Sequence, residues 1–357
     1  MAGRVTLQTL ADAVGVSRTT VSNAYNRPDQ LAPELRAAIL AKAAEFGYAG
    51  PDPAARRLRS GRRRAVALMF SERLSYAVTD PAAIALLQGL AEATEAKGYE
   101  LLLLPGQRGT GVEVESVREA VVGAFCLYCM PDDHPALRAA LERRLPVVVV
   151  DEPRLLGTFF VGIDDHGGAR QAAEHVRALG HEHVAVIVDR LRDDGAGDRV
   201  VDAARIAEGY YRVSRERIAG YFEGLGKLVP VYEALENQRA AGERAAAALL
   251  ALSPRPTALL CASDQLALGA LDAIRAAGLD VPGDVAVAGY DDVPEAAGAG
   301  LTTVRQPLLE KGRQAGRLLL ERDTEREVVL PVELVVRGST VPPALTAYGT
   351  LSGPLSV

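Results

Sequence analysis

The sequence predicts an α/β protein in which a helix-turn-helix unit precedes a larger domain built on parallel sheets. Residues 6–26 have the pattern of two short amphipathic helices joined by a turn at Gly15. From Ala65 onward, apolar runs of strand length alternate with helical patterns, which is typical of parallel sheets. The chain has 357 residues, of which 48% are hydrophobic, so it can bury a large core in more than one domain.

The segment "GVSRTTVSNAYN", residues 15–26, predicts a helix that exposes a polar face. Ser17 is a good N-cap for a helix over residues 18–25, and Thr6 can cap an upstream helix over residues 7–14. Polar residues share the outer face of the second helix: Arg18, Thr19, Ser22, Asn23 and Asn26. This pattern is typical of a helix-turn-helix that lays one helix in the DNA major groove, with a solvated hairpin as the alternative.

A third helix is predicted over residues 33–46, with Leu35, Ile39 and Phe46 as candidate core positions. Its N-cap position holds Ala32, which cannot accept a side-chain capping bond. The run "PDPAARRLRSGRRR", residues 51–64, then predicts a short basic helix. Residues 1–64 carry 11 Lys and Arg against 5 Asp and Glu, whereas the remainder carries 29 against 41. A basic head on an acidic body indicates that only the head meets phosphate.

The body shows about two sheets' worth of alternating strands and helices. The predicted strands are "AVALMF", "YELLLLP", "AFCLYCM", "PVVVVD", "HVAVIVD", "PVYEAL", "TALLCAS" and "VAVAGYD". The predicted helices are 81–97, 114–122, 135–143, 167–179, 239–252 and 265–277. Ligands of such sheets bind beyond the carboxyl ends of the strands, so we expect a binding cleft there.

Composition and motifs argue against several other classes of protein. The N-terminus lacks the apolar run of a signal peptide, and no stretch approaches the roughly 20 apolar residues of a membrane span. Three cysteines in a chain of this length favour the cytoplasm. Cys126 and Cys129 form a CxxC, but strand alternation would point their thiols to opposite faces, so no metal site or cofactor is expected. We find no P-loop, dinucleotide-binding or GxSxG signature and expect no enzyme.

Several motifs together resemble those of the LacI/GalR (lactose-repressor) family of bacterial transcription regulators. They are "VTLQTLADAVGVSRTTVSNAYN", "GYAGPDPAARRLRSGR", "GIDDHGGARQAAEHVRALGH", "ASDQLALGAL", "VPGDVAVAGYDD", "LTTVRQP" and "VELVVRGST". The resemblance implies a DNA-binding domain at 1–50, a hinge helix at 51–64, an effector-binding and dimerisation domain at 65–340, and a tail at 341–357. The regulatory domain would hold two subdomains similar to periplasmic sugar-binding proteins. The implied partners are pseudo-palindromic operator DNA, a small-molecule effector and a second copy of the chain. The tail lacks leucine heptads, which favours a dimer over a tetramer.

The resemblance also implies roles for residues of the DNA-binding head. Arg18, Thr19 and Asn23 would read base edges. Phosphate contacts would come from Thr6, Ser17, Thr20, Ser22 and Asn26. In the hinge, Leu58 would act as a minor-groove wedge flanked by Arg56 and Arg59, with packing of Leu58 on the regulatory domain as the alternative.

In the regulatory domain, Arg217, Asp291 and Asp151 match family positions that bind the effector. Ser263 stands where relatives have Asn, and Asn237 where many have an aromatic residue. The loop 71–80 is longer than usual and adds Tyr76 and Asp80, and an insertion at about 191–213 adjoins the same cleft. The alternative is that Asp291 only caps a turn and Arg217 pairs with a carboxylate.

Few stacking residues are available for a flat ligand. Aromatic residues make up 5% of the chain, which has no Trp, and Ala82 and Ala83 stand where many relatives have aromatic side chains. This scarcity favours a small, polar, sugar-like effector, and the resemblance implies that the protein which it controls is a repressor. A regulator without an effector, or one that responds to a nucleoside or purine, is the alternative.

Overall fold

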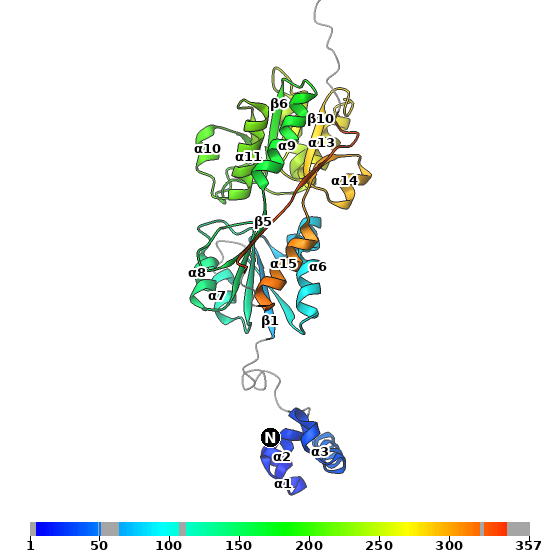
Figure 1. Ribbon diagram of the computed structural model, residues 1–357. Coiled ribbons are helices and arrows are strands. Elements are labelled where there is room, and N and C mark those ends of the chain that lie inside the picture. The colour runs from blue at the N-terminus through cyan, green and yellow to red at the C-terminus, as the bar shows by residue number, and fades with distance from the viewer. Residues whose placement is uncertain (1–4, 49, 51–63, 107–111, 322–324, 341–357) are drawn as a thin grey trace, which may run out of the picture. The chain divides into compact units, whose positions relative to one another are not determined.

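The computed structural model describes residues 5–48, 50, 64–106, 112–321 and 325–340 (Figure 1). The chain separates into two compact units, Met1–Arg63 and Arg64–Val357. The predicted hinge residues Arg56, Leu58 and Arg59 and the tail 341–357 lie outside the described residues. Within the described ranges, no helix is long and apolar enough to cross a membrane.

The first unit is a three-helix bundle with a helix-turn-helix at its start. It contains α1 (Leu7–Val14), α2 (Arg18–Asn26), a 3-10 turn (Pro28–Gln30) and α3 (Pro33–Glu45). Thr6 caps α1 and Ser17 caps α2, as predicted, each by accepting a hydrogen bond from a backbone N–H three residues on. The fully buried Leu10, Val21 and Ile39 bring the three helices together.

The prediction that Phe46 belongs to the core of this unit is wrong. Helix α3 ends at Glu45, and the Phe46 side chain beyond it is 38% exposed. Tyr48 closes this end of the bundle instead, with its ring edge-on to Tyr25 at a centroid distance of 6.2 Å. At the other end of α3, Ala32 makes no side-chain capping bond, as its methyl group predicts.

The second unit contains two α/β subdomains, the predicted fold class. One holds a six-stranded sheet of order β12-β5-β4-β3-β1-β2, and the other a seven-stranded sheet of order β13-β11-β10-β9-β6-β8-β7. The six-stranded sheet is parallel throughout, while β13 and β7 run antiparallel at the two edges of the other sheet. The strands are β1 (Ala65–Phe70), β2 (Glu100–Leu104), β3 (Ala124–Tyr128), β4 (Val147–Val150), β5 (Phe159–Ile163), β6 (Val184–Val188), β7 (Arg199–Val201), β8 (Val231–Glu233), β9 (Ala258–Cys261), β10 (Ala286–Asp291), β11 (Thr302–Arg305), β12 (Glu327–Leu330) and β13 (Glu333–Val335).

Helices cover these sheets. They are α5 (Leu74–Ala77), α6 (Pro81–Glu95), α7 (Val112–Glu119), α8 (Pro135–Glu142), α9 (Asp165–Ala178), α10 (Ala203–Ala207), α11 (Arg212–Leu225), α12 (Arg239–Leu250), α13 (Asp264–Ala276), α14 (Pro294–Gly298) and α15 (Leu308–Glu321). All eight predicted strands and six predicted helices are present. The sequence prediction missed the short strands β5, β7, β11, β12 and β13 and the helices α5, α10, α11, α14 and α15.

The chain passes between the two subdomains three times. It leaves the six-stranded sheet after β5, returns after β11 to form α15, and leaves again between β12 and β13. Although α15 follows a strand of the other sheet, it packs beside α6 in the first subdomain (Figure 1). The two subdomains are therefore joined by three short segments, 164, 306–307 and 331–332.

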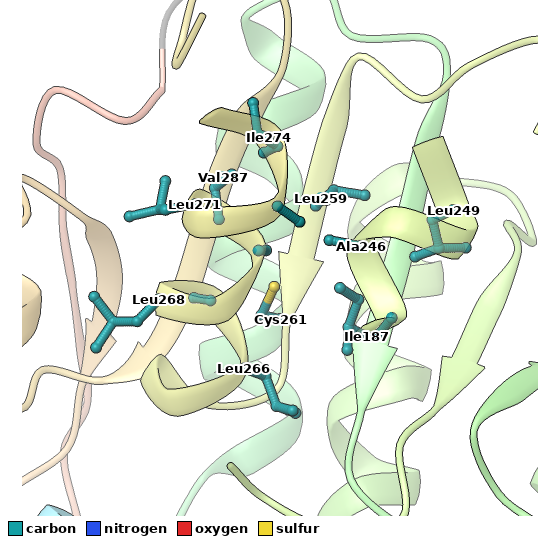
Figure 2. Packing of buried hydrophobic residues seen from close by; sticks show 14 of the residues in the cluster. Ile187, Ala246, Leu249, Leu259, Cys261, Leu266, Leu268, Leu271, Ile274 and Val287 are labelled. Atoms are coloured by element: carbon teal, nitrogen blue, oxygen red, sulfur yellow. The ribbon is translucent and has the colours of Figure 1, made fainter. Parts of the chain in front are cut away.

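Glycines let the covering helices approach each other closely. A Cβ atom on Gly89 of α6 would lie 1.9 Å from the carbonyl oxygen of Leu309 in α15. A Cβ atom on Gly269 of α13 would likewise lie 1.9 Å from the carbonyl oxygen of Arg239 in α12. Between these last two helices and β9, Leu259, Cys261 and Leu266 form part of a continuous apolar core (Figure 2).

The prediction that both CxxC thiols lie in one strand is wrong. Strand β3 ends at Tyr128, and Cys129 adopts a left-handed backbone with φ of 49°. The Cys129 thiol lies 3.9 Å from a carboxylate oxygen of Asp151, whereas Cys126 is buried in the core. Among the described residues, no group of three or more His, Cys, Asp or Glu side chains could hold a metal ion.

Candidate functional site

The predicted DNA-reading side chains lie together on α2 of the first unit. Arg18 and Thr19 are exposed at the start of the helix, and Asn23 is half-buried one turn further on. Among the residues predicted to meet phosphate, the Ser17 and Thr20 hydroxyl groups lie 2.8 Å apart, and the Asn26 amide donates to the Ser22 hydroxyl at 3.0 Å. Thr6 is exposed, and its hydroxyl group accepts a hydrogen bond from the Thr9 backbone N–H. These local bonds hold the polar side chains in place without burying them.

A cavity of about 110 Å³, which we call the inner chamber, lies between the two subdomains of the second unit. One subdomain contributes Phe70, Ser71, Glu72, Tyr76, Ala77, Asp80, Ala83, Tyr128, Cys129 and Glu152. The other contributes Asp189, Arg190, Tyr211, Val213, Ser214 and Asn237. Most of these residues follow the carboxyl ends of strands β1, β3, β4, β6 and β8, where parallel sheets are expected to bind ligands.

A larger cavity of about 730 Å³, the outer vestibule, adjoins the inner chamber. The two cavities share five lining residues: Ser71, Glu72, Tyr76, Arg190 and Asn237. Four of these make contacts between the subdomains. The Tyr76 hydroxyl group donates to the backbone carbonyl of Asn237 at 2.9 Å, and Arg190 pairs with Glu72. A ligand that enters the chamber from the vestibule must pass these contacts.

Three of the predicted effector residues line the inner chamber: Tyr76, Asp80 and Asn237. Asp80 caps α6 by accepting a hydrogen bond from the Ala83 backbone N–H at 3.2 Å. Ser263, another predicted effector residue, is not part of the lining of either cavity. It caps α13 and donates to the Asn237 side-chain oxygen, so it orients a lining residue.

The other three predicted effector residues, Arg217, Asp151 and Asp291, are not part of either lining. The Arg217 guanidinium stacks on the Tyr290 ring at 3.7 Å, and its Nε donates to the Asp165 carboxylate at 2.9 Å. Asp291 lies 3.8 Å from the same guanidinium. The structure therefore shows the carboxylate pairing of Arg217 that the sequence left open as the alternative, and a ligand contact from this arginine stays a prediction.

These residues belong to a buried chain of charged and polar groups, which we call the crossover network: Asp151, Asp165, Arg217, Asp291, Gln306 and Lys311. The Lys311 ammonium group, fully buried, lies 2.6 Å from the Asp151 carboxylate and also bonds Gln306. The Gln306 amide donates to Asp291, which completes the chain to Arg217. Asp151 and Asp291 adopt positive φ values of 67° and 118°, so the network also holds two strained backbone positions.

Two acidic residues of the inner chamber, the buried Glu152 and the half-buried Asp189, were not among the predicted site residues. Glu152 follows β4 and accepts a hydrogen bond from the backbone N–H of Val213 at 2.9 Å, a further link between the subdomains. Asp189 follows β6 and accepts from the Ser214 hydroxyl group at 2.8 Å. Glu152 directly follows one predicted strand, and Asp189 is the last residue of another. The expectation that ligands bind beyond the carboxyl ends of parallel strands could therefore have identified both residues.

Burial dominates the electrostatics of these acids. It raises the pKa of Glu152 to about 8 and that of Asp80 to about 6. The pKa of Asp189 is also raised by burial, although the hydrogen bond from Ser214 opposes the shift. The chamber thus holds carboxyl groups whose charged forms are poorly solvated.

The predicted insertion at about 191–213 forms one wall of the cleft. Arg192, Asp193 and Gly195 line the vestibule, and Tyr211 and Val213 line the chamber. The insertion is fastened by Arg205, whose guanidinium bonds the fully buried Glu233 at 2.7 Å and also pairs with Asp194. The backbone N–H of Leu191 donates to the same Glu233 carboxylate at 2.7 Å, so one buried acid holds both the start of the insertion and the helix α10 within it.

Comparison with known proteins agrees with this architecture. Residues 173–340 match the family of periplasmic binding protein-like domains. A helix-turn-helix-type transcriptional regulator of Mycobacterium tuberculosis is 44% identical over 353 residues, with 96% of this chain and 98% of the relative covered. A solved LacI-family regulator from Corynebacterium glutamicum is 31% identical and superposes with a TM-score of 0.72, covering 95% of this chain and 99% of its own. The chain belongs to the LacI family of transcriptional regulators. A further LacI-like neighbour is the regulator CelR in complex with cellobiose, which is 30% identical with a TM-score of 0.66 and covers 94% of this chain and 100% of its own.

The buried Glu152 predicts a pH dependence of stability. Because its pKa rises from an ordinary 4.5 to about 8, the folded protein retains between these pH values a proton that the unfolded chain has lost. The free energy of unfolding contributed by this group is therefore fully present below about pH 4.5 and falls as the pH rises through about 8. Thermal unfolding of the wild type and of Glu152→Gln should show a smaller loss of stability with rising pH in the variant. Parallel pH profiles would contradict the prediction, and the exposed Glu95→Gln serves as the control.

Proposed function

We propose that this LacI-family regulator is a repressor that binds a pseudo-palindromic operator as a homodimer in the cytoplasm and responds to a small, polar, sugar-like effector. The observation that carries the proposal is the inner chamber, which lies between two subdomains and is lined by polar groups from both. A molecule bound there contacts both subdomains at once and so favours one of their relative arrangements. Such differential affinity is what couples a ligand to a distant DNA site.

The chemistry of the lining supports a sugar-like ligand over a flat base. Its hydrogen-bonding groups include carboxyl, hydroxyl and amide side chains, which suit a ligand rich in hydroxyl groups. Ala82 and Ala83 at the start of α6 offer no aromatic ring for stacking. Contrary to the expectation that stacking residues are scarce, four aromatic residues elsewhere in the lining can pack against the apolar face of a sugar ring: Phe70, Tyr76, Tyr128 and Tyr211. The cellobiose complex of the related CelR supports the same class of ligand.

The DNA-binding half of the proposal depends on α2 and on a pair of such units. One recognition helix reads only a few base pairs, so two copies on a symmetric operator supply the affinity and length of site that a regulator needs. The predicted hinge residues Arg56, Leu58 and Arg59 would add the minor-groove contact. In this proposal, the effector acts by changing how the two heads are presented.

Replacing Arg18 tests the predicted base readout. Arg18→Ala should relax the preference at one position of each operator half-site, at a cost of about 1–3 kcal/mol on the preferred sequence. Selection of binding sites from a randomised DNA pool measures this preference directly. The matched control is Lys42→Ala, which removes one half-exposed positive charge from α3 and should leave the preferred sequence unchanged. An unaltered preference for Arg18→Ala would contradict the assignment.

Tyr76→Phe tests the effector response. Fluorescence anisotropy with labelled DNA from upstream of the protein's own gene measures binding, with and without cellobiose, monosaccharides, nucleosides and purines. We expect at least one sugar to change the DNA affinity of the wild type. Tyr76→Phe, which loses the bond to Asn237, should bind DNA normally without ligand. The ligand concentration that gives half of the full response should differ from that of the wild type by about two- to tenfold, because the variant lacks one bond between the subdomains.

The control for that experiment is Tyr232→Phe, since the Tyr232 ring is buried away from both cavities. A response to nucleosides or purines alone would contradict the sugar-like class. DNA binding that no small molecule alters would favour a regulator without an effector.

A further inference from the structure

We propose that the inner chamber selects an uncharged polyol or sugar ring over its anionic derivatives, with Glu152 and Asp189 as the specificity-determining residues. This inference rests on the proposed function and narrows the chemical class of its effector. The derivatives that it excludes are phosphate esters and sugar acids.

The charges on the chamber wall are unbalanced. Four carboxyl groups line it, those of Glu72, Asp80, Glu152 and Asp189, against the single guanidinium of Arg190. That guanidinium is already committed, because it pairs with Glu72 and lies 3.1 Å from the Asp193 carboxylate. No lining cation is therefore left to neutralise an anionic ligand.

The nearby guanidinium of Arg217 does not change this balance. It bonds Asp165 at 2.8 Å and stacks on Tyr290, and it is not part of the lining. In the vestibule, Arg192 is likewise paired, with Glu208 at 3.0 Å. An anionic substituent that extended outward from the chamber to Arg192 would meet a cation that already has a carboxylate partner.

Glu152 and Asp189 come from different subdomains, and both bond the start of α11 beside the chamber. Each uses one oxygen for the protein: Oε2 of Glu152 accepts from the Val213 backbone N–H, and Oδ1 of Asp189 accepts from the Ser214 hydroxyl group. The second oxygens, Oε1 of Glu152 and Oδ2 of Asp189, receive no side-chain hydrogen bond from the described residues. They can accept hydrogen bonds from ligand hydroxyl groups, one from each subdomain.

Burial makes this discrimination strong. The raised pKa values of Glu152 and Asp189 show that negative charge is already costly in the chamber. A negative charge on the ligand would be poorly solvated in the same site and would find no unpaired lining cation. A ligand hydroxyl group, by contrast, can form a hydrogen bond with a carboxyl oxygen whether that carboxyl group is charged or neutral. The volume of about 110 Å³, small beside the roughly 300–1,000 Å³ of drug-sized sites, suits a single ring.

Calorimetry and thermal-shift measurements on the full chain test the inference with matched compounds. The panel contains neutral hexoses, pentoses and cyclic polyols, together with the phosphate ester and the acid derived from each. We expect at least one neutral compound to bind saturably and its anionic derivatives to bind at least tenfold more weakly. Tighter binding of an anionic derivative than of its neutral parent would overturn the inference.

Two nearly isosteric variants assign the selectivity to the named residues. Glu152→Gln and Asp189→Asn should each lower the affinity for the neutral ligand by about tenfold. Each should also reduce the ratio of the affinity for the neutral ligand to the affinity for its anionic derivative. Asp264→Asn is the matched control: this carboxylate is fully buried, but it bonds Thr303 and Val293 and lines neither cavity. Unchanged selectivity in both chamber variants would overturn the assignment.

The outcomes separate this inference from the proposed function. An anionic compound that binds the chain and alters its DNA affinity would contradict the inference and leave the effector-controlled regulator intact. The absence of binding by every compound, with DNA affinity unaltered, would count against both.

Discussion

The buried ion pair between Lys311 and Asp151 is the interaction on which the regulatory unit depends. Lys311 is fully buried. Its ammonium group is held by Asp151, which follows β4, and by Gln306, which lies in the second connecting segment. A buried charge that loses its partner costs about 3–5 kcal/mol, so the pair must form for the unit to fold as it does. Because Gln306 in turn bonds Asp291, the pair anchors the polar chain that runs from one subdomain into the other.

The buried pair between Lys311 and Asp151 also explains why contacts in different parts of the cleft differ in character. The crossover network holds the base of the cleft where the three connecting segments lie, whereas the contacts at its mouth are few and polar. Under the proposed function, a ligand in the chamber would replace or reinforce the contacts of Tyr76 and Glu72 without breaking the buried network. Small shifts of one subdomain against the other are the kind of movement that such an arrangement allows, because rigid packed bodies move about short connections.

Much of the fold could be predicted because its central strands are buried on both faces. The run 147–150 is four consecutive valines, all buried, whereas the missed β12 is a half-exposed edge strand. Helix α15 was missed because Gly312 and Gly316 weaken its helical signal, and the same glycines allow its close approach to α6. Tyr76, Asp80 and Asn237 were found as candidates for the cleft. The sequence left open that Arg217 pairs with a carboxylate, but it could not identify Asp165 as the partner, because that choice depends on how α9 packs against α11.

Hydrogen–deuterium exchange of the wild type and of Lys311→Met tests the central role of the buried pair most directly. Leu249→Ala, a core substitution in the α12 region, is the control for general loss of stability. The account predicts faster exchange in Lys311→Met at the segments around Asp151, Asp165 and Gln306, with helices α12 and α13 unchanged, and the opposite distribution in Leu249→Ala. Uniformly faster exchange throughout Lys311→Met, or none at the crossovers, would contradict it.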